Sequence, residues 1–498
     1  MSKESKTEAS AMSRAVVPLQ EPARRPLYVD MDGTLLATDA LWEMLIRLLR
    51  TQPWLLLSAP FWLMKGKAAF KRQLVSHITL NPALLPYHEP VIDYLTQERR
   101  KGRDVILATA SDREVAMSVA NHLDIFSGVL ASDGTVNLAG QAKLSAILVH
   151  AEGADFDYVG NSRSDLPIWQ RASRALLVKP SRRLLAKTGQ TSSVEAVLCA
   201  RPPFFRVFFR TLRVHQWSKN VLLLVPLLLA HKFTDTARLV SAILAFAAFS
   251  LAASGVYILN DLLDLESDRQ HPTKRSRPLA AGLLSIPIAL STAVLAIASS
   301  ALIAVAFLPI LFVGVLLIYQ TTTMAYSFAL KRIAILDVIV LAGLYTIRVL
   351  AGAVATDVPV SPWFLAFSTF LFLSLAFVKR YGELRLAGNR GADAGFLEAR
   401  GYQPGDLDLL RSVGASSGYV AVAVFALYIS SGDVHLLYAR PAALWLIGPL
   451  ILYWITRVWF LAHRGKMHDD PVVFALTDTP SYVLAGLIAI LLIIASIK

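Results

Sequence analysis

The chain has 498 residues, is 55% hydrophobic and has a mean hydropathy of +0.51, values that exclude a soluble protein of ordinary composition and suggest membrane spans. Its formal net charge of +13 would suit nucleic acid. In a membrane protein, however, basic residues more often mark cytoplasmic loops and phosphate sites, so we expect no nucleic-acid partner. A single cysteine, Cys199, excludes an intramolecular disulfide and a cysteine-cluster metal site.

The composition changes along the chain. The first residues are polar and lack the apolar stretch of a signal peptide, so we expect a disordered tail at 1–26 and a cytoplasmic domain after it. Up to about Arg201 apolar and charged segments are mixed, whereas after Asn220 apolar blocks alternate with short polar loops. The sequence therefore predicts an N-terminal domain, a basic linker and a membrane domain, at residues 27–185, 186–205 and 206–498.

Several polar residues stand at or just after the ends of predicted strands in the N-terminal domain. The stretches are "LYVDMDGTLLATD", "DVILATAS" and "FDYVGNSRSDLPIW", with "LAGQAKLSAI" between the last two. The polar residues are Asp30, Asp32, Thr109, Ser111, Lys143, Asn161 and Asp165. Open α/β sheets hold their ligands at the carboxyl ends of the strands, so we expect these side chains to form one site.

The residue types in this order suit phosphate chemistry. One carboxylate can attack phosphorus, a second can exchange a proton with the leaving group, a lysine can neutralise the phosphate, and further oxygen ligands can hold Mg²⁺. The order resembles a haloacid dehalogenase-type phosphohydrolase, which implies a Rossmann-like α/β fold. The implied roles are nucleophile for Asp30, acid and base for Asp32, phosphate binding for Thr109, Ser111 and Lys143, and Mg²⁺ binding for Asp30, Asp32, Asn161 and Asp165.

Two alternatives stay open for this domain. The family often has Asp where Asn161 stands, so the domain can also be a degenerate one that is kept for packing or regulation. Residues 40–90 fall between the first two motifs and are predicted to form a small helical cap. Within the cap, "PWLLLSAPFWLM" (53–64) is too short to cross a bilayer and is either interfacial or part of the cap core.

The second half of the chain predicts nine membrane-spanning helices, the first of which is short for a bilayer about 30 Å thick. The predicted spans are 219–233, 238–260, 285–305, 308–329, 334–354, 362–379, 413–430, 441–461 and 480–497. Alternate loops hold 19 Lys and Arg on one side and only three on the other. By the positive-inside rule we expect a multi-pass protein of the inner (plasma) membrane, with a cytoplasmic N-terminal domain and the C-terminus on the far side.

The loop after the second predicted span begins with an acidic stretch and continues with a basic one, in "ILNDLLDLESDRQHPTKRSRPLAAG". Asn260, Asp264 and Asp268 recur every four residues, with Asp261 beside the first, so on a helix they line one face. Clustered carboxylates near a bilayer repel one another unless a cation lies between them. We therefore expect Mg²⁺ that bridges to a substrate diphosphate. Phosphate oxygens beyond the metal would contact the basic residues that follow, Arg269, His271, Lys274, Arg275 and Arg277. The alternative is a solvated acidic and basic loop.

This motif resembles the UbiA-type prenyltransferase superfamily over about residues 205–498, without that family's usual second aspartate-rich motif. Further stretches resemble its decaprenyl-phosphate phosphoribosyltransferase branch, namely "LRVHQWSKN", "YSFALKR", "YTIRVLAGAVA", "KRYGEL" and "DPVVFALTD". The branch implies transfer of 5-phosphoribosyl from phosphoribosyl pyrophosphate to a polyprenyl phosphate, with Mg²⁺ held by Asp261, Asp264 and Asp268 at the departing pyrophosphate.

Several groups are needed for the remaining phosphates. The candidates are Lys219, Asn260, Lys274, Arg277, Tyr326, Lys331, Arg348, Lys379 and Arg380. Arg348 lies within a predicted span, where an unpaired guanidinium is costly, so it either binds substrate or pairs with Glu383 or Asp337.

Three functions remain to be separated. We expect the fused phosphatase to remove the 5-phosphate of the product, with one Mg²⁺ in each domain and membrane lipid around the second. The alternative enzyme is a prenyltransferase that uses an aromatic acceptor, and the alternative without catalysis is a transporter or scaffold for phosphosugars. The sequence does not indicate an oligomeric state.

Overall fold

The computed structural model describes residues 25–390, 400–432, 434–467, 471–475 and 477–497. The chain divides after Pro202 into two compact units. The tail expected at 1–26 lies outside the described residues apart from Arg25 and Pro26.

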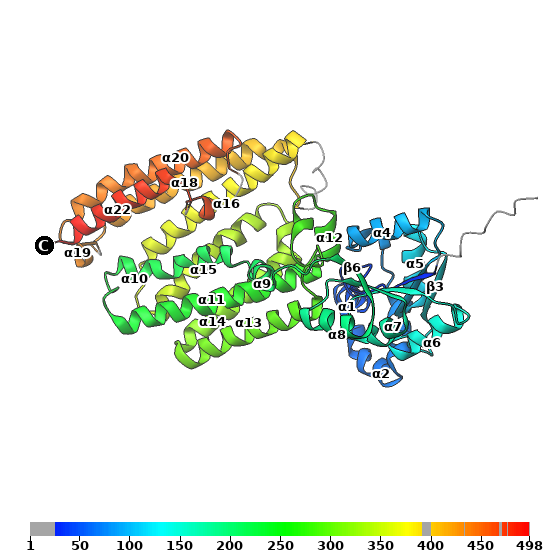
Figure 1. Ribbon diagram of the computed structural model, residues 1–498. Helices are drawn as coiled ribbons and strands as arrows, with labels where there is room; N and C mark the ends of the chain where they lie inside the picture. Colours follow the sequence, from blue (N-terminus) through cyan, green and yellow to red (C-terminus); the bar gives the residue numbers. More distant parts are fainter. Residues whose placement is uncertain (1–24, 391–399, 433, 468–470, 476, 498) are drawn as a thin grey trace, which may run out of the picture. The chain divides into compact units, whose positions relative to one another are not determined.

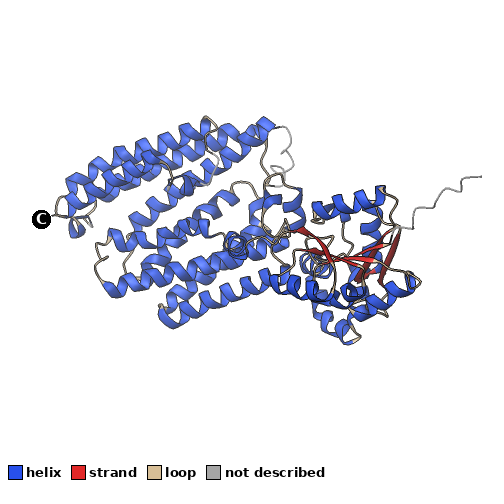
Figure 2. Cartoon of the chain, in the orientation of Figure 1, coloured by secondary structure: helices blue, strands red, loops and turns tan. Residues whose placement is uncertain are grey.

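The first unit is a six-stranded parallel sheet in the order β3-β2-β1-β4-β5-β6, with helices on both faces (Figure 2). The strands are β1 Leu27–Val29, β2 Val105–Asp112, β3 Gly128–Ser132, β4 Asp157–Gly160, β5 Arg174–Val178 and β6 Val194–Cys199. The helices that follow the strands are α4 Glu89–Arg100, α5 Arg113–Leu123, α6 Gln141–His150, α7 Leu166–Arg171 and α8 Arg182–Thr191. Along β1, Leu27 and Val29 enter one hydrophobic core and Tyr28 enters the other, which is why all three residues are buried.

Between β1 and α4 the chain forms a mainly helical segment, which is called the cap below. It consists of α1 Ala40–Thr51, the 3₁₀ helix η1 Pro53–Ser58, α2 Ala59–Met64, α3 Lys67–His77 and η2 Pro82–Leu84. Asp39 starts α1 by accepting hydrogen bonds from the amides of Leu41 and Trp42.

The expected linker at 186–205 needs correction. Most of α8 and all of β6 fall within it, and β6 pairs with β5 as the last strand of the sheet. Exposure alternates along "VEAVLC", with Glu195 and Val197 exposed and Ala196 and Leu198 packed against the core, because an edge strand has one face toward the core and one toward solvent. The boundary between the units therefore lies at Pro202, and not near residue 185.

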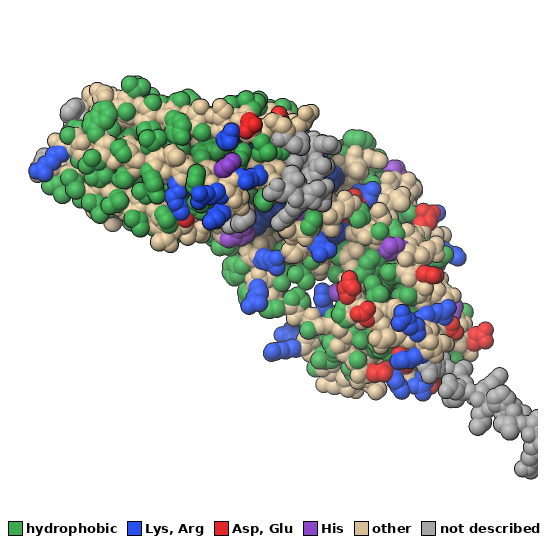
Figure 3. All heavy atoms as spheres, turned by 90° about the horizontal axis from the view of Figure 1, so that it is seen from above, with side chains coloured by type: hydrophobic (Ala, Val, Ile, Leu, Met, Phe, Trp, Pro, Cys, Tyr) green, Lys and Arg blue, Asp and Glu red, His purple; other side chains and the backbone are tan. Residues whose placement is uncertain are grey.

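The second unit is built from long helices that lie side by side (Figure 1). Its main helices are α11 Thr236–Leu263, α13 Ile286–Phe307, α14 Ile310–Phe328, α15 Leu336–Ala355, α16 Pro362–Arg390, α18 Leu407–Ile429, α20 Ile447–His463 and α22 Thr479–Ser496. Shorter elements are α9 Phe204–Thr211, η4 Val214–Leu224, α10 Val225–Leu229, α12 Leu265–Gln270, η5 Lys274–Ser276, η6 Leu330–Arg332, η7 Pro404–Asp406, α19 Val434–Leu437, η8 Pro441–Leu446 and α21 Pro471–Ala475. In the face seen in Figure 3, hydrophobic side chains cover much of this unit and charged ones are few.

Within the described residues, eight helices are long and apolar enough to cross a membrane, so the first of the nine predicted spans, 219–233, is not confirmed. Residues 219–233 instead contain the end of η4 and the five-residue α10, with Pro226 at the start of α10. The stretch from Arg213 to His231 still runs along the unit from one end to the other. Arg213 contacts Asp261 near one end, and the side chain of His231 lies 3.3 Å from that of Ser496 near the other. Gly352 of α15 permits the close packing, since a Cβ there would lie 1.9 Å from the carbonyl oxygen of Leu223.

Candidate functional site

The seven residues predicted in the α/β unit all lie near the carboxyl ends of β1, β2 and β4. Lys143, from α6, reaches in and its Nζ lies 2.7 Å from Oδ1 of Asp30 and 3.8 Å from Oδ1 of Asp165. Asp165 also accepts hydrogen bonds from the hydroxyl of Tyr158 and from the amides of Asn161 and Ser162. The first aspartate of the motif thus faces a buried ammonium group.

The second aspartate has different partners. Oδ2 of Asp32 accepts a hydrogen bond of 2.6 Å from the hydroxyl of Ser111, and Oδ1 accepts one from the amide of Ala40 at the start of the cap. Thr109 is fully buried and its Oγ1 accepts from the amide of Ser111. Ser111 therefore contacts Asp32 directly, whereas Thr109 holds the backbone of Ser111 in place.

Asn161 lies against the backbone of the first motif. Gly33 has φ +74°, a left-handed conformation that favours glycine, and a Cβ at Gly33 would lie 2.0 Å from Nδ2 of Asn161. The glycine of the "DMDGT" motif is thus required both by its turn and by the amide that closes the site.

Burial changes the acidity of both aspartates. Desolvation raises the pKa of Asp30 to about 7, although the nearby Lys143 opposes this rise. Desolvation also raises the pKa of Asp32 to about 6. The ion pairs of Lys143 outweigh the effect of its own burial and raise its pKa. Two buried carboxyl groups with pKa values near neutrality suit a site that must bind an anion and exchange protons.

One residue at this edge was not predicted. Lys71 of α3 donates hydrogen bonds from Nζ to the carbonyl of Ala110 at 2.6 Å and to Asn137 at 2.9 Å. Burial lowers its pKa, and the charges of Asp32 and Asp39 oppose that effect. The cap therefore supplies a second cation near the site, and nothing in the local pattern of "AAFKRQ" indicates this.

The donor set of the α/β unit fits Mg²⁺. Asp30, Asp32 and Asp165 are buried or nearly so, and these three carboxylates outnumber the lysine between them. Such hard oxygen ligands are those that Mg²⁺ prefers, and a dication would relieve their desolvation. In the conformation of the structure, the described ranges contain no group of three or more His, Cys, Asp or Glu side chains that could hold a metal ion.

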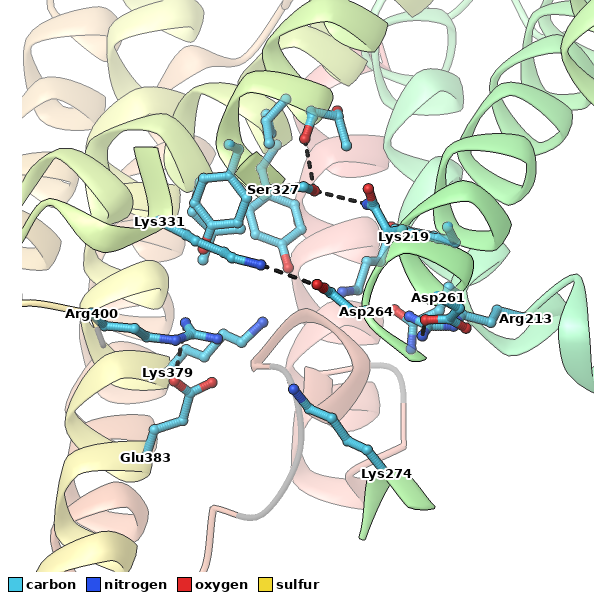
Figure 4. Close-up of a pocket in the computed structure, with 18 of the residues that line it drawn as sticks. Arg213, Lys219, Asp261, Asp264, Lys274, Ser327, Lys331, Lys379, Glu383 and Arg400 are labelled. Carbon is cyan, nitrogen blue, oxygen red and sulfur yellow. Dashed lines mark hydrogen bonds and ion pairs between the residues drawn. The ribbon is translucent and has the colours of Figure 1, made fainter. Parts of the chain in front are cut away.

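The second unit contains a charged cavity of about 420 Å³ (Figure 4). Among the described residues that line it, eight are basic: Arg213, Lys219, Lys274, Arg277, Lys331, Arg348, Lys379 and Arg400. Three are acidic: Asp261, Asp264 and Glu383. Asn260 and Tyr326 also line it, as predicted for substrate contacts. So large an excess of cations around one cavity suits a ligand with several phosphate groups.

The aspartates do not follow one uninterrupted helix. α11 ends at Leu263, Asp264 is its C-cap, and α12 starts at Leu265. The spacing nevertheless holds, because the amide of Asp264 donates to Asn260 and that of Asp268 donates to Asp264. The repeat of four residues therefore survives a helix break.

Each aspartate has a basic partner. Nη1 of Arg277 lies 3.1 Å from Asp261 and 2.6 Å from Asp268. Arg213 pairs with Asp261, and Nζ of Lys331 lies 3.8 Å from Asp264. Asp268 is buried behind this group and does not line the cavity.

One part of the cavity wall is built around Arg348. Its guanidinium donates to Oδ1 of Asn220 at 2.9 Å and to the hydroxyl of Tyr319 at 3.1 Å, and its Cζ lies 4.9 Å from the centroid of the Tyr319 ring. Nζ of Lys219 lies 5.8 Å from the centroid of the Tyr345 ring. Two cations are thus held by amide and aromatic groups in this part of the cavity wall.

Arg380, also predicted to bind phosphate, lies outside the cavity lining. It is 1% exposed and forms ion pairs with Asp337 and Glu383, while Tyr402 donates a hydrogen bond to Asp337. Arg380 therefore pairs with Asp337 and Glu383, the two carboxylates that the sequence suggested as partners of Arg348.

Sequence reasoning missed Arg213, Arg400 and the position of Glu383 as lining residues. Arg213 lies in the quoted "LRVHQWSKN" stretch and could have been found there. Arg400 follows the residues that lie outside the described part of the chain, and only the fold brings it 3.5 Å from Glu383.

The residues that would hold Mg²⁺ in the helical unit fit it by chemistry. Asn260, Asp261 and Asp264 offer side-chain oxygens on the cavity wall. Because Asp261 is paired with the guanidinium groups of Arg213 and Arg277, a metal would have to share the carboxylate with these groups or displace them.

A second cavity, of about 580 Å³, is mainly apolar and lies among α10, α16, α18, α20 and α22. Aromatic side chains line it, among them Trp363, Phe367, Tyr438 and Trp454. Among the described residues, none lines both this cavity and the charged one.

The fold and the two sites define a class. The chain is an integral membrane protein with a charged cavity in its helical unit and a cluster of aspartates around a buried lysine in its α/β unit. Residues 221–477 match the UbiA prenyltransferase family and residues 27–170 match haloacid dehalogenase-like hydrolases. The chain belongs to the UbiA prenyltransferase family and carries a haloacid dehalogenase-like domain before it, which confirms both resemblances.

Three relatives illustrate this. "Uncharacterized protein y4nM" of Sinorhizobium fredii is 38% identical over 93% of this chain and 90% of its own length. "Nodulation protein NoeC" of Azorhizobium caulinodans is 36% identical over 56% of this chain and 90% of its own. "Decaprenyl-phosphate phosphoribosyltransferase" of Mycolicibacterium smegmatis is 38% identical over 57% of this chain and 92% of its own. The first match covers both units, so their fusion is shared.

Proposed function

We propose that the helical unit transfers 5-phosphoribosyl from phosphoribosyl pyrophosphate to a polyprenyl phosphate at the cytoplasmic side of the inner membrane. An oxygen of the lipid phosphate would attack C1 of the ribose, the bond from C1 to the pyrophosphate oxygen would break, and pyrophosphate would leave. The observation that carries this proposal is the charged cavity with its eight basic residues. The name of the M. smegmatis relative supports the same transferred group and a polyprenyl phosphate as its acceptor.

The basic residues stand on two sides of the cavity. Lys331, Lys379 and Arg400 lie on one side in Figure 4, and Arg213 and Lys219 lie on the other. Two separate groups of cations suit two separate phosphate-bearing substrates. When bound by Asp261 and Asp264, Mg²⁺ would neutralise charge on the departing pyrophosphate.

The arrangement supports a role for each group of residues. Arg277, which already bridges two aspartates, would orient the diphosphate beside them. Lys219 and Arg348, which also line the cavity, would hold a second phosphate. Glu383 could accept hydrogen bonds from hydroxyl groups of the sugar, because it brings an acceptor into a basic surrounding.

We further propose that the α/β unit removes the 5-phosphate of the ribosyl lipid. Asp30 would attack the phosphorus, Asp32 would protonate the leaving oxygen and later activate water, and Lys143 and Ser111 would bind the phosphate oxygens. The buried Asp30–Lys143 pair and the raised pKa of Asp32 support these roles.

The test uses the purified full chain with Mg²⁺, phosphoribosyl pyrophosphate labelled in the ribose or in the 5-phosphate, and several polyprenyl phosphates. A labelled lipid with release of pyrophosphate is the expected result. Product from a polyprenyl diphosphate and an aromatic acceptor would support the alternative transferase, and binding without turnover would support a transporter or scaffold. Label lost as free phosphate by the native chain but retained by Asp30→Asn would support the phosphatase step. A native chain that leaves the 5-phosphate in place would contradict it.

A further inference from the structure

The cap of the α/β unit carries an apolar surface that the proposed chemistry does not use. Trp54, Leu57, Phe61, Leu63 and Met64, here called the cap patch, are 64%, 78%, 68%, 52% and 83% exposed. Four of them follow one another at intervals of three, four and three residues along η1 and α2, which places them in one stripe. Exposed apolar surface of this kind marks a binding surface.

The opposite face of the same segment is already occupied. Leu55, Leu56, Ala59 and Trp62 pack against the core of the α/β unit, and the ring of Trp62 stacks on His77 at 5.3 Å. The segment is therefore apolar on all sides, a property of helices that are buried on all sides. Packing within the unit accounts for one face only.

The charged residues near the cap patch indicate what covers its exposed face. From Met44 to His88 the chain contains no Asp or Glu, and its basic residues there are Arg47, Arg50, Lys65, Lys67, Lys71 and Arg72. Lys65 and Lys67 are exposed and follow the cap patch directly. An apolar stripe with aromatic residues and basic neighbours suits an anionic lipid surface, where the rings lie among the headgroups and the cations meet phosphate.

The length of the segment determines how it can meet a membrane. Pro53–Met64 is among the shorter apolar helices, well below the roughly 20 residues that a span requires. Among the described residues of the same chain, eight helices are long and apolar enough to cross a membrane, so the chain itself lies at a bilayer. We propose that the cap patch inserts into the headgroup region of an anionic bilayer, parallel to its surface.

This surface has a consequence for the neighbouring site. α3 starts at Lys67, directly after the cap patch, and carries Lys71, which reaches the edge of the sheet beside Ala110. A cap held on the bilayer would keep this edge close to lipid headgroups. That consequence rests on the proposed phosphatase function, whereas the binding surface does not.

The test measures lipid contact directly in the full chain. A Cys199→Ser background receives Leu57→Cys or, as a control, Val149→Cys, whose native residues are 78% and 80% exposed on the same unit. Each cysteine carries an environment-sensitive fluorophore, and the protein is placed in nanodiscs that contain nitroxide lipids. We expect a blue shift and a loss of emission at position 57 and neither change at position 149. Replacing the anionic lipid by a zwitterionic one, or introducing Lys65→Gln with Lys67→Gln, should reduce the loss.

Two outcomes would overturn the proposal. Equal emission and equal quenching at both positions would show that the cap patch stays in water. A blue shift at position 57 without quenching by the nitroxide lipids would show that protein covers the patch. An unchanged pattern of limited proteolysis confirms that each labelled chain is folded, and because no catalytic activity is measured, the result is independent of the proposed function.

Discussion

Nη1 of Arg277 lies 2.6 Å from Oδ2 of Asp268, and the same nitrogen lies 3.1 Å from Oδ1 of Asp261. One guanidinium thus holds together two carboxylates that are seven residues apart, across the break between α11 and α12. Both contacts come from one nitrogen, which the planar guanidinium holds in a fixed direction, whereas a lysine ammonium is a compact group on a flexible stem and is not fixed in this way. Arg277 therefore organises the aspartates as well as adding charge to the cavity.

Arg277→Lys should impair transfer although it keeps the charge. Charged hydrogen bonds contribute about 1.5–3 kcal/mol each, so losing one should lower kcat/KM for phosphoribosyl pyrophosphate by roughly ten- to a hundred-fold. Steady-state kinetics at saturating lipid would measure this. Arg275→Lys is the matched control, because Arg275 is exposed in the same loop and does not line the cavity. Equal kinetics of the two variants would contradict the bridging role.

Asp261 and Asp264 should be required for transfer, whereas the neighbouring Glu266 should not be. Asp261→Asn and Asp264→Asn each remove a carboxylate from the cavity wall, so we expect loss of labelled lipid product and of its dependence on Mg²⁺. Glu266→Gln, from the same acidic stretch but outside the cavity lining, should retain activity. The assay also includes a chelator. Transfer by the native chain that continues unchanged after removal of Mg²⁺ would disprove the metal role.

The α/β unit offers a test of its tightest contact. In Gly33→Ala the new Cβ would meet Nδ2 of Asn161 at 2.0 Å, so Asn161 must move and phosphatase activity should fall. Gly153→Ala is the control, because Gly153 also has a positive φ, +81°, yet has nothing within 4 Å of the new Cβ. Both variants should lose about 1 kcal/mol of stability from the backbone. Only the first should lose hydrolysis, and neither should lose transfer. If both hydrolyse equally, the Asn161 contact does not matter for the site.

The sequence could predict those residues of the α/β site that belong to a recognisable motif in the chain. It could not predict a residue that only the fold brings to the site. Asp30 and Asp32 follow a buried strand directly, and parallel strands bring their carboxyl ends together, so the site edge could be predicted from the motifs alone. Lys71 could not, because it comes from the middle of a cap helix and only tertiary packing places it beside Ala110.

The helical unit shows the same limit. The spacing of Asn260, Asp264 and Asp268 predicted their grouping, but not the helix break at Asp264, since the acidic stretch contains no proline or glycine that would indicate one. Arg213 and Arg400 approach the cavity from segments far apart in the chain. The first predicted span, 219–233, was the shortest apolar block, and there hydropathy alone does not predict the mixed 3₁₀ and α conformation.

Adjacent basic residues on α16 permit a last prediction. Lys379 lines the charged cavity, whereas Arg380 is buried against Asp337 and Glu383. Lys379→Met should therefore raise KM for phosphoribosyl pyrophosphate and leave the melting temperature in detergent nearly unchanged.

Arg380→Met leaves the buried carboxylate of Asp337 without its ion-pair partner, a loss of about 3–5 kcal/mol in buried pairs, so the melting temperature should fall clearly. Arg380→Met with Asp337→Asn should recover part of that loss, because the uncompensated buried charge is then gone. If Arg380→Met keeps its melting temperature and raises KM as Lys379→Met does, Arg380 binds substrate phosphate, as the sequence predicted, and the buried pairs contribute little to stability.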